Sequence, residues 1–257
     1  MDRKVKERRR LVSRERGRRR AGLIFLGVIV LAAAALFLWL RSSDVFAVEQ
    51  ITAPATRHVT QQQIADAVES ARGVSLLKVS TGDVEEALRE LPYVRTVHVY
   101  RSFPHGLEVR LEEYDPVARL EASDGETWLM AENGRLLEKK SGAEAGSLPL
   151  VVTAAEVTAQ AGGTVPQTVL AAMPVAVMLT GSEAVAGLPA VEQILVAAGG
   201  EVTVRLEDGA ELRLGVPIDL KHKMTVAIGI IQEYLRDGKA LEYVDASAAD
   251  RVAVKAQ

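Results

Sequence analysis

A 20-residue apolar run near the N-terminus constrains this chain more strongly than any other feature. The run begins at Ala21, ends at Leu40 and contains no charged residue and no proline. An α-helix rises about 1.5 Å per residue, so a helix of this length matches the roughly 30 Å hydrocarbon core of a bilayer. The run therefore predicts a single transmembrane helix over residues 21–40.

The charges are distributed unevenly on the two sides of this run. Residues 1–20 contain 11 Lys or Arg and 3 Asp or Glu, a net charge of +8, whereas the whole chain has a net charge of −3. Basic residues collect on the cytoplasmic side of membrane helices, and the opposite interface favours aromatic residues such as Trp39. We therefore predict a basic cytoplasmic tail and a single-pass type II topology in the cell (inner or plasma) membrane. Everything after Arg41 is expected to be extracytoplasmic.

Two other interpretations of the N-terminal segment stay open. A cleaved signal peptide also joins a basic region to an apolar one, and residues 45–47 loosely resemble a cleavage site, but its apolar region usually has about 7 to 15 residues. A tail that binds nucleic acid is the second alternative, although no aromatic residue is interleaved with the arginines. Attraction to anionic lipids, about 1 kcal/mol per cation, explains the tail without nucleic acid. We expect membrane lipids as partners and no nucleic acid.

The segment after the apolar run has the pattern of a β-α-α-β-β domain. Residues 46–53 are predicted as a strand, and two short helices follow, because Thr60 and Ser80 stand at N-cap positions before amphipathic stretches. Alternation of apolar and polar residues then predicts two strands joined by a loop at residues 102–106. The side chains expected to face the core are those of Val97, Val99, Leu107 and Val109. We assign this first domain to residues 46–114.

Residues 115–257 are mostly β in pattern, with two helices. The expected elements are a hairpin over 127–137 with a type I′ turn at Asn133-Gly134, a loop at 141–146, a helix at 165–179, a strand at 191–197, a hairpin over 201–214, a helix at 219–238 and strands at 241–246 and 251–255. Asp219 is expected as N-cap of the second helix and Gly238 as its end. Its inward face is expected to carry Ile228, Ile231 and Leu235. The predicted fold class is α+β, with a β-rich second domain over residues 115–257.

The residue types that usually carry catalysis are scattered or missing. Cysteine is absent, which excludes disulfides, thiolate metal sites and cysteine nucleophiles. The four histidines do not have the i, i+4 spacing of a helical metal site, and no phosphate-binding loop or nucleophile motif is present. We therefore predict a protein without enzymatic activity, metal or cofactor.

Several short stretches are shared with a known family. They are Leu91-Pro92-Tyr93-Val94, Pro104, Glu113, Pro116-Val117-Ala118, Asp208-Gly209, Leu214-Gly215, Lys223 and Tyr243-Val244-Asp245. Their order after one apolar run resembles the FtsQ/DivIB family of bacterial cell division proteins, whose first extracytoplasmic module is a POTRA domain. The chain departs from the family pattern at Tyr114, where a basic residue is common, and at Ala131-Glu132. Lys223 is interpreted either as a family residue or as a solvated base in the first turn of a helix.

The resemblance implies a function. It implies a non-enzymatic scaffold of the divisome at the division septum, which links early and late division proteins and helps control septal peptidoglycan synthesis. The implied partners are FtsB/DivIC-like and FtsL-like bitopic proteins and, through them, the septal synthases FtsW and FtsI. A membrane-anchored or secreted POTRA-containing chaperone or transport adaptor is the alternative function.

The partner site is expected at the last hairpin. No later segment is expected to cover the strand predicted at residues 251–255, and an exposed strand edge binds an extended peptide through backbone hydrogen bonds. A structural edge strand protected by its own charges is the alternative. Proline at Ala253 separates the two if the N–H of this residue points outward. The predicted partner-binding residues are Tyr243, Val244, Asp245, Arg251, Val252, Ala253, Val254 and Lys255.

Overall fold

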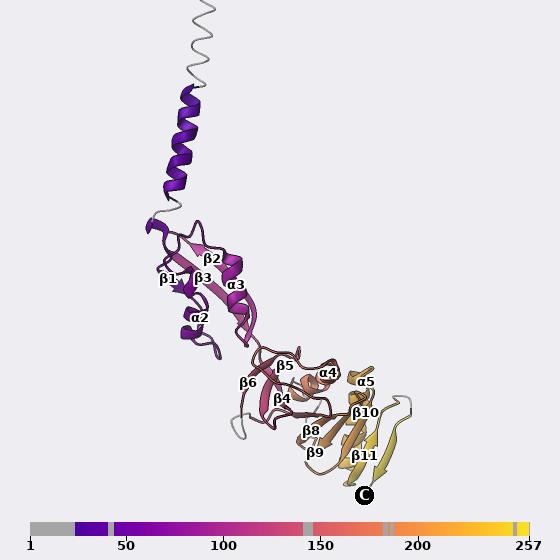
Figure 1. The fold of residues 1–257 in the computed structure, drawn as a ribbon. Helices are drawn as coiled ribbons and strands as arrows, with labels where there is room; N and C mark the ends of the chain where they lie inside the picture. Colours follow the sequence, from indigo (N-terminus) through magenta and orange to yellow (C-terminus); the bar gives the residue numbers. More distant parts are fainter. Residues whose placement is uncertain are drawn as a thin grey trace, which may run out of the picture. The chain divides into compact units, whose positions relative to one another are not determined.

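The computed structural model of the protein describes residues 24–40, 44–140, 146–181, 185, 188–248 and 251–256. Residues 24–40 form a helix (Figure 1), along which the large apolar side chains from Ile24 to Trp39 are exposed. Within the described ranges, no helix is both long and apolar enough to cross a membrane. The predicted basic tail and Ala21 lie outside the described residues.

The next elements have the predicted β-α-α-β-β order. They are η1 (Asp44–Phe46), β1 (Gln50–Thr52), α2 (Gln61–Ala67), η2 (Glu69–Ala71), α3 (Thr81–Arg89), β2 (Val94–Ser102) and β3 (Gly106–Glu113). The three strands form one sheet in the order β1-β3-β2, in which β1 is parallel to β3. The structure confirms the predicted order, with the short 3₁₀ helices η1 and η2 in addition.

The first strand is shorter than predicted, because β1 begins only at Gln50. The backbone before it bonds to the segment between the two helices. The N–H of Val48 donates to the carbonyl oxygen of Val74 at 3.0 Å, and the N–H of Leu76 donates to that of Phe46 at 2.7 Å. These bonds replace sheet pairing for the residues that precede β1.

Local sequence signals account for α3 and for the hairpin of β2 and β3. The Ser80 hydroxyl oxygen accepts a hydrogen bond from the N–H of Asp83 at 3.3 Å, which confirms Ser80 as the N-cap. All four side chains predicted to face the core are buried, namely Val97, Val99, Leu107 and Val109. The predicted alternation of this hairpin is therefore confirmed.

Among the described residues after Glu113, nine strands form one sheet with two helices. The elements are β4 (Pro116–Glu121), β5 (Thr127–Ala131), β6 (Leu136–Lys139), β7 (Leu150–Thr153), α4 (Gln167–Gly181), β8 (Val191–Val196), β9 (Val202–Leu206), β10 (Glu211–Gly215), α5 (Leu220–Arg236), β11 (Leu241–Asp245) and β12 (Ala253–Ala256). The strand order is β12-β11-β10-β9-β8-β7-β4-β5-β6. Helices α4 and α5 lie side by side against the sheet (Figure 1), and their buried side chains share a core with alternate strand residues. Strands β4 and β7 are additional to the predicted elements.

The chain divides into two compact units. The first unit comprises Met1–Ala55, Gln61–Ala87 and His98–Arg110, and the second unit comprises Thr56–Thr60, Leu88–Val97 and Leu111–Gln257. The last residues of α3 and the first residues of β2 thus belong to the second unit. Within this unit, the guanidinium of Arg135 donates to the carbonyl oxygens of Pro92 at 2.9 Å and of Arg89 at 3.0 Å.

The turn between β5 and β6 is not the predicted type I′ turn. That turn requires a positive φ at both central residues, but Gly134 has one (φ 77) and Asn133 does not. The N–H of Gly134 donates to the carbonyl oxygen of Ala131 at 2.9 Å, which closes a type I turn followed by a left-handed glycine. A Cβ at Gly134 would lie 2.7 Å from Cγ2 of Val165, so packing also requires glycine.

Two details of α5 differ from the prediction. Asp219 stands at the N-cap with φ 52, but its side chain makes no capping hydrogen bond. Leu235 is 38% exposed, because the buried stripe that includes Ile231 continues toward Tyr234, which packs partly against the core. Gly238 follows the helix with φ 67, as predicted for a helix end.

Most of the loop predicted at 141–146 lies outside the described residues.

Candidate partner-binding site

Strand β12 is the outermost strand on one side of the nine-stranded sheet. It pairs antiparallel with β11, and the register places Ala253 opposite Asp245, Val254 opposite Val244 and Lys255 opposite Tyr243. The strand begins later than predicted, at Ala253, and the N–H of Arg251 donates to the carbonyl oxygen of Ala248 at 2.9 Å. Arg251 and Val252 therefore precede the strand.

The backbone groups of β12 point alternately toward β11 and toward the free edge. The N–H of Ala246 donates to the carbonyl oxygen of Arg213 in β10 at 2.9 Å, so the backbone groups of the preceding Asp245 point toward β12. Its partner Ala253 therefore pairs inward, whereas Val254 directs its N–H and C=O to the free edge. The condition for the proline test at Ala253 is not met, and Val254 is the informative position.

The side chains of the last hairpin divide between the core and the other face of the sheet. Val244 is fully buried, and Val252 and Val254 pack partly against the same core. Ala253 and Lys255 are exposed on the opposite side. The structure thus confirms the predicted alternation of these two pairs of residues.

A row of polar side chains crosses the open face of the sheet and ends at β12. The strand registers align Arg205, Glu211, Tyr243 and Lys255 in this row. The guanidinium of Arg213 lies 4.2 Å from the ring centroid of Tyr243 and 3.0 Å from the carboxylate of Glu211. The hydrogen bond from Arg213 lowers the pKa of Glu211 against the opposing effect of burial, and Arg205 assists at 3.2 Å. The open face beside the edge is therefore a charged, mixed-sign surface.

Asp245 orders the segment that leads into β12. Its carboxylate accepts the N–H of Ser247 at 2.9 Å, and hydrogen bonds from the side chain and backbone of Ser247 lower the pKa of Asp245. Gly215 has φ 64, and a Cβ there would lie 2.8 Å from that of Ser247. Asp245 therefore fixes the backbone at Ser247, just after β11.

Lys223 is buried, so its interpretation as a solvated base is wrong. Its side chain donates from Nζ to the carbonyl oxygens of Leu214 at 2.9 Å and Val216 at 3.0 Å. These bonds fix the end of β10 to the first turn of α5, beside β11. Helical spacing contains the signal for this burial, because Leu220, Lys223 and Ala227 share one buried face.

A second cluster, which sequence patterns did not identify as a site, surrounds Glu113 in the second unit. Its carboxylate accepts the N–H groups of Arg57 at 2.8 Å, His58 at 3.0 Å and Val59 at 2.7 Å. Burial raises the pKa of Glu113, but these backbone hydrogen bonds outweigh it, so the pKa lies below its ordinary value. The ring of His58 also stacks on Tyr93, with centroids 4.2 Å apart. The cluster fixes the backbone of the 56–60 segment.

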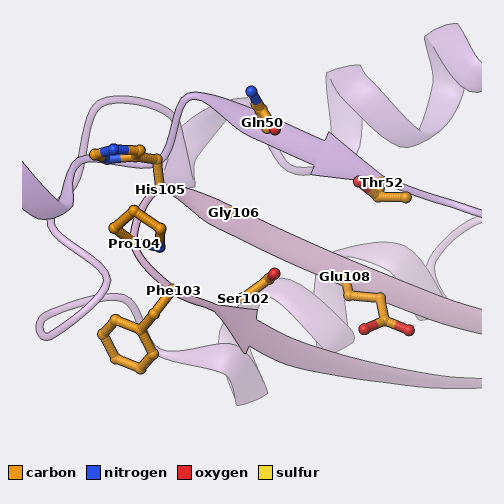
Figure 2. A pocket seen from close by; sticks show the side chains of 8 residues that line it. All are labelled: Gln50, Thr52, Ser102, Phe103, Pro104, His105, Gly106 and Glu108. Carbon is orange, nitrogen blue, oxygen red and sulfur yellow. The ribbon is translucent and has the colours of Figure 1, made fainter.

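A hollow of about 280 Å³ lies beside the β2–β3 hairpin in the first unit (Figure 2). It is lined by Gln50, Thr52, Ser102, Phe103, Pro104, His105, Gly106 and Glu108. Figure 2 shows the ring of His105 directed away from the side chain of Ser102, so these two do not pair as base and nucleophile. In the part of the chain that the structure describes, no group of three or more His, Cys, Asp or Glu is placed to hold a metal ion. The edge of β12 is therefore the stronger candidate site.

Comparison with known proteins finds two adjacent matches. The family model described as POTRA domain, FtsQ-type, matches residues 46–114, and the one described as Cell division protein FtsQ/DivIB, C-terminal, matches residues 118–247. Among curated relatives, Cell division protein FtsQ of Anaeromyxobacter sp. is 29% identical over 248 residues, which are 91% of this chain and 82% of that protein.

Two further relatives with the same name match over shorter segments. The protein of Streptomyces venezuelae is 38% identical over 103 residues, which are 40% of this chain and 38% of that protein. The protein of Myxococcus fulvus is 28% identical over 125 residues, which are 49% of this chain and 43% of that protein. The chain thus matches less than half of the length of these two relatives.

Proposed function

The chain belongs to the FtsQ/DivIB family of cell division proteins, and we propose that it acts in division as a membrane-anchored, non-enzymatic scaffold of the divisome. In this role it links early and late division proteins at the septum and helps control septal peptidoglycan synthesis by binding other proteins. The single observation that carries the scaffold role is the free edge of β12.

The proposed binding surface is this edge together with the adjoining open face. Within the described residues no strand lies beyond β12 in the sheet, and Val254 directs its backbone groups away from β11. Backbone groups at a sheet edge pair with an extended segment of a partner, and alternate side chains supply specificity. Tyr243 and Lys255 lie in register on the open face, where they meet the side chains of an added strand.

The proposed partner is an FtsB/DivIC-like bitopic protein, accompanied by an FtsL-like one. Through these two proteins the scaffold reaches the septal synthases FtsW and FtsI. Arg251 is exposed just before the strand, and Lys255 is exposed within it but pairs with Glu242 at 2.6 Å. The charge of Arg251 favours a partner segment that carries an acidic residue at that end.

The proposed anchor is the apolar run over residues 21–40. Between Ile24 and Trp39 the structure exposes every large apolar side chain of the helix. Exposure of such surface to water is unfavourable by about 25 cal/mol per Å², whereas lipid tails surround it without this penalty. The basic tail then lies in the cytoplasm, and the part of the chain after Arg41 lies on the other side of the membrane.

A pair of variants at Val254 tests the edge. Val254→Pro and Val254→Ala both remove the valine side chain, but only proline removes the outward N–H and fills the place of the added strand. We expect the proline variant of the full chain to bind the purified FtsB-like partner about tenfold more weakly than the alanine variant, equivalent to about 1.4 kcal/mol. Binding is measured in detergent, and thermal unfolding verifies that both variants are folded. Equal binding by both variants would place the site elsewhere, most directly on α5.

A further inference from the structure

The first unit exposes apolar side chains at one place. Beyond residue 40, its exposed large apolar side chains among the described residues are Phe103 (57% exposed), Val45 (51%) and Tyr100 (48%). The ring of Phe103 meets that of its neighbour Phe46 edge-on, with centroids 6.0 Å apart. Tyr100, Phe103 and Leu77 line one shallow hollow. These five residues, Val45, Phe46, Leu77, Tyr100 and Phe103, are called the apolar tip below.

Val45, Tyr100 and Phe103 of this tip are exposed, and Phe46 and Leu77 are half-buried. Phe103 stands in the turn between β2 and β3, and Figure 2 shows its ring directed away from Gln50 and Thr52 of β1. The backbone of Phe46 is fixed by a hydrogen bond, because its carbonyl oxygen accepts the N–H of Leu76 at 2.7 Å. A fixed group of apolar side chains that faces outward marks an interaction surface.

Basic side chains accompany the apolar tip. Arg101 lines the same hollow as Tyr100 and Phe103, and its guanidinium donates to the carbonyl oxygen of Val79 at 2.8 Å, which fixes its direction. Lys78 is exposed next to Leu77. Glu108 lies farther along β3, beside Thr52 (Figure 2). Aromatic and basic side chains together are typical of protein surfaces that contact lipid headgroups.

The length of the connecting chain determines what can cover the tip. Only residues 41–44 separate Val45 from the last residue of the apolar run, Leu40. An extended chain spans at most about 3.6 Å per residue, so Val45 lies within about 18 Å of the end of the run. If the run spans the bilayer, the tip stays within reach of the headgroup layer.

We propose that the apolar tip inserts into the headgroup layer on the extracytoplasmic side of the membrane, so that the first unit has a lipid surface as its partner. This proposal rests on the membrane anchor proposed above. Phe103 and Tyr100 enter the interface beside the lipid chains, while Arg101 and Lys78 meet the phosphates. The first unit is then held against the bilayer at the tip as well as through the anchor.

Single cysteines test the insertion, because the chain contains no cysteine of its own. Phe103→Cys and Asp66→Cys are made in the full chain and labelled with an environment-sensitive fluorophore. Asp66 is exposed on α2 in the same unit and serves as the control position. Both proteins are reconstituted into vesicles of phosphatidylethanolamine and phosphatidylglycerol, with and without nitroxide-labelled lipid.

We expect blue-shifted emission and quenching by the nitroxide lipid at position 103, and neither effect at position 66. Unquenched, water-like emission at 103 in a chain that floats with the vesicles and resists carbonate extraction would overturn the insertion while leaving the anchor in place. A chain that carbonate removes would overturn the anchor and the insertion together. Blue-shifted emission without quenching would show that protein, not lipid, covers the tip, and would also overturn the proposal.

Discussion

At the scale of single residues, Lys223 shows how the fold satisfies a buried ammonium group. Its two hydrogen bonds go to the carbonyl oxygens of Leu214 and Val216. A hydrogen bond from a charged donor contributes about 1.5–3 kcal/mol, and its loss leaves a buried carbonyl unsatisfied. We therefore expect Lys223→Met, which keeps much of the side-chain volume, to lower the free energy of unfolding by about 2–4 kcal/mol.

Denaturant unfolding of the full chain in detergent measures this difference. Lys221→Met is the matched control, because Lys221 lies in the same helical turn and is exposed. Exposed substitutions of this kind usually change the free energy of unfolding by less than about 0.5 kcal/mol. Equal, small effects of the two substitutions would contradict the structural role assigned to Lys223.

Glu113 makes the stability of the second unit depend on pH. Its pKa is lower in the folded protein than its ordinary value, so folding favours the charged carboxylate. The stabilisation is fully present above the ordinary pKa of about 4.3 and disappears as the pH falls through the lower folded-state pKa. We expect Glu113→Gln to have a lower thermal midpoint than the native chain at neutral pH, and expect this difference to shrink below about pH 4.

Thermal unfolding of the full chain between about pH 3 and pH 7 tests this dependence, over the range in which glutamate titrates. Glu112→Gln is the control, since Glu112 is the exposed neighbour on the same strand. A Glu113→Gln difference that stayed constant over the whole range would show that the charge of the carboxylate is not the source of the stabilisation.

At the scale of elements, the sequence predicted correctly those features that depend on interactions between residues close together in the chain. Alternation placed the inward residues of β2 and β3 correctly, because burial of one face imposes a period of two. The N-cap at Ser80 was also readable, since its hydrogen bond closes within three residues. The start of β1 was not predictable in this way. The backbone before it bonds to Val74 and Leu76, which are distant in the sequence. Strand β7 is parallel to both of its neighbours and therefore leaves no hairpin signal. Strand β4 forms an antiparallel hairpin with β5, which the prediction missed.

The same distinction explains how far the candidate site was predictable. The alternation of Val252 and Val254 with Ala253 followed from the sequence pattern and is confirmed. Which backbone groups face the free edge did not follow, because the bond between Ala246 and Arg213 of a neighbouring strand decides it. The side-chain pattern and the direction of the backbone groups are separate properties of an edge strand. A partner strand depends on both, because it pairs with the backbone groups and contacts the side chains.

At the scale of the whole molecule, the proposed scaffold requires the basic tail and the part of the chain after Arg41 to lie on opposite sides of the membrane. The net charge of +8 over residues 1–20 favours retention of the tail in the cytoplasm. We expect alkaline phosphatase, which is active only outside the cytoplasm, to be active when fused after Gln257 and inactive when fused before Met1.

Sequencing of the mature N-terminus makes this test decisive, because a secreted protein would also give an active fusion after Gln257. An uncleaved anchor keeps residues 1–20 on the protein, whereas signal-peptide cleavage would leave a mature chain that starts near Val48. Such a chain would lack the whole apolar run and would have no membrane anchor. An active reporter on a chain that retains its basic N-terminus therefore supports the anchored topology, and an active reporter on a chain that starts near Val48 would replace the scaffold with a secreted protein.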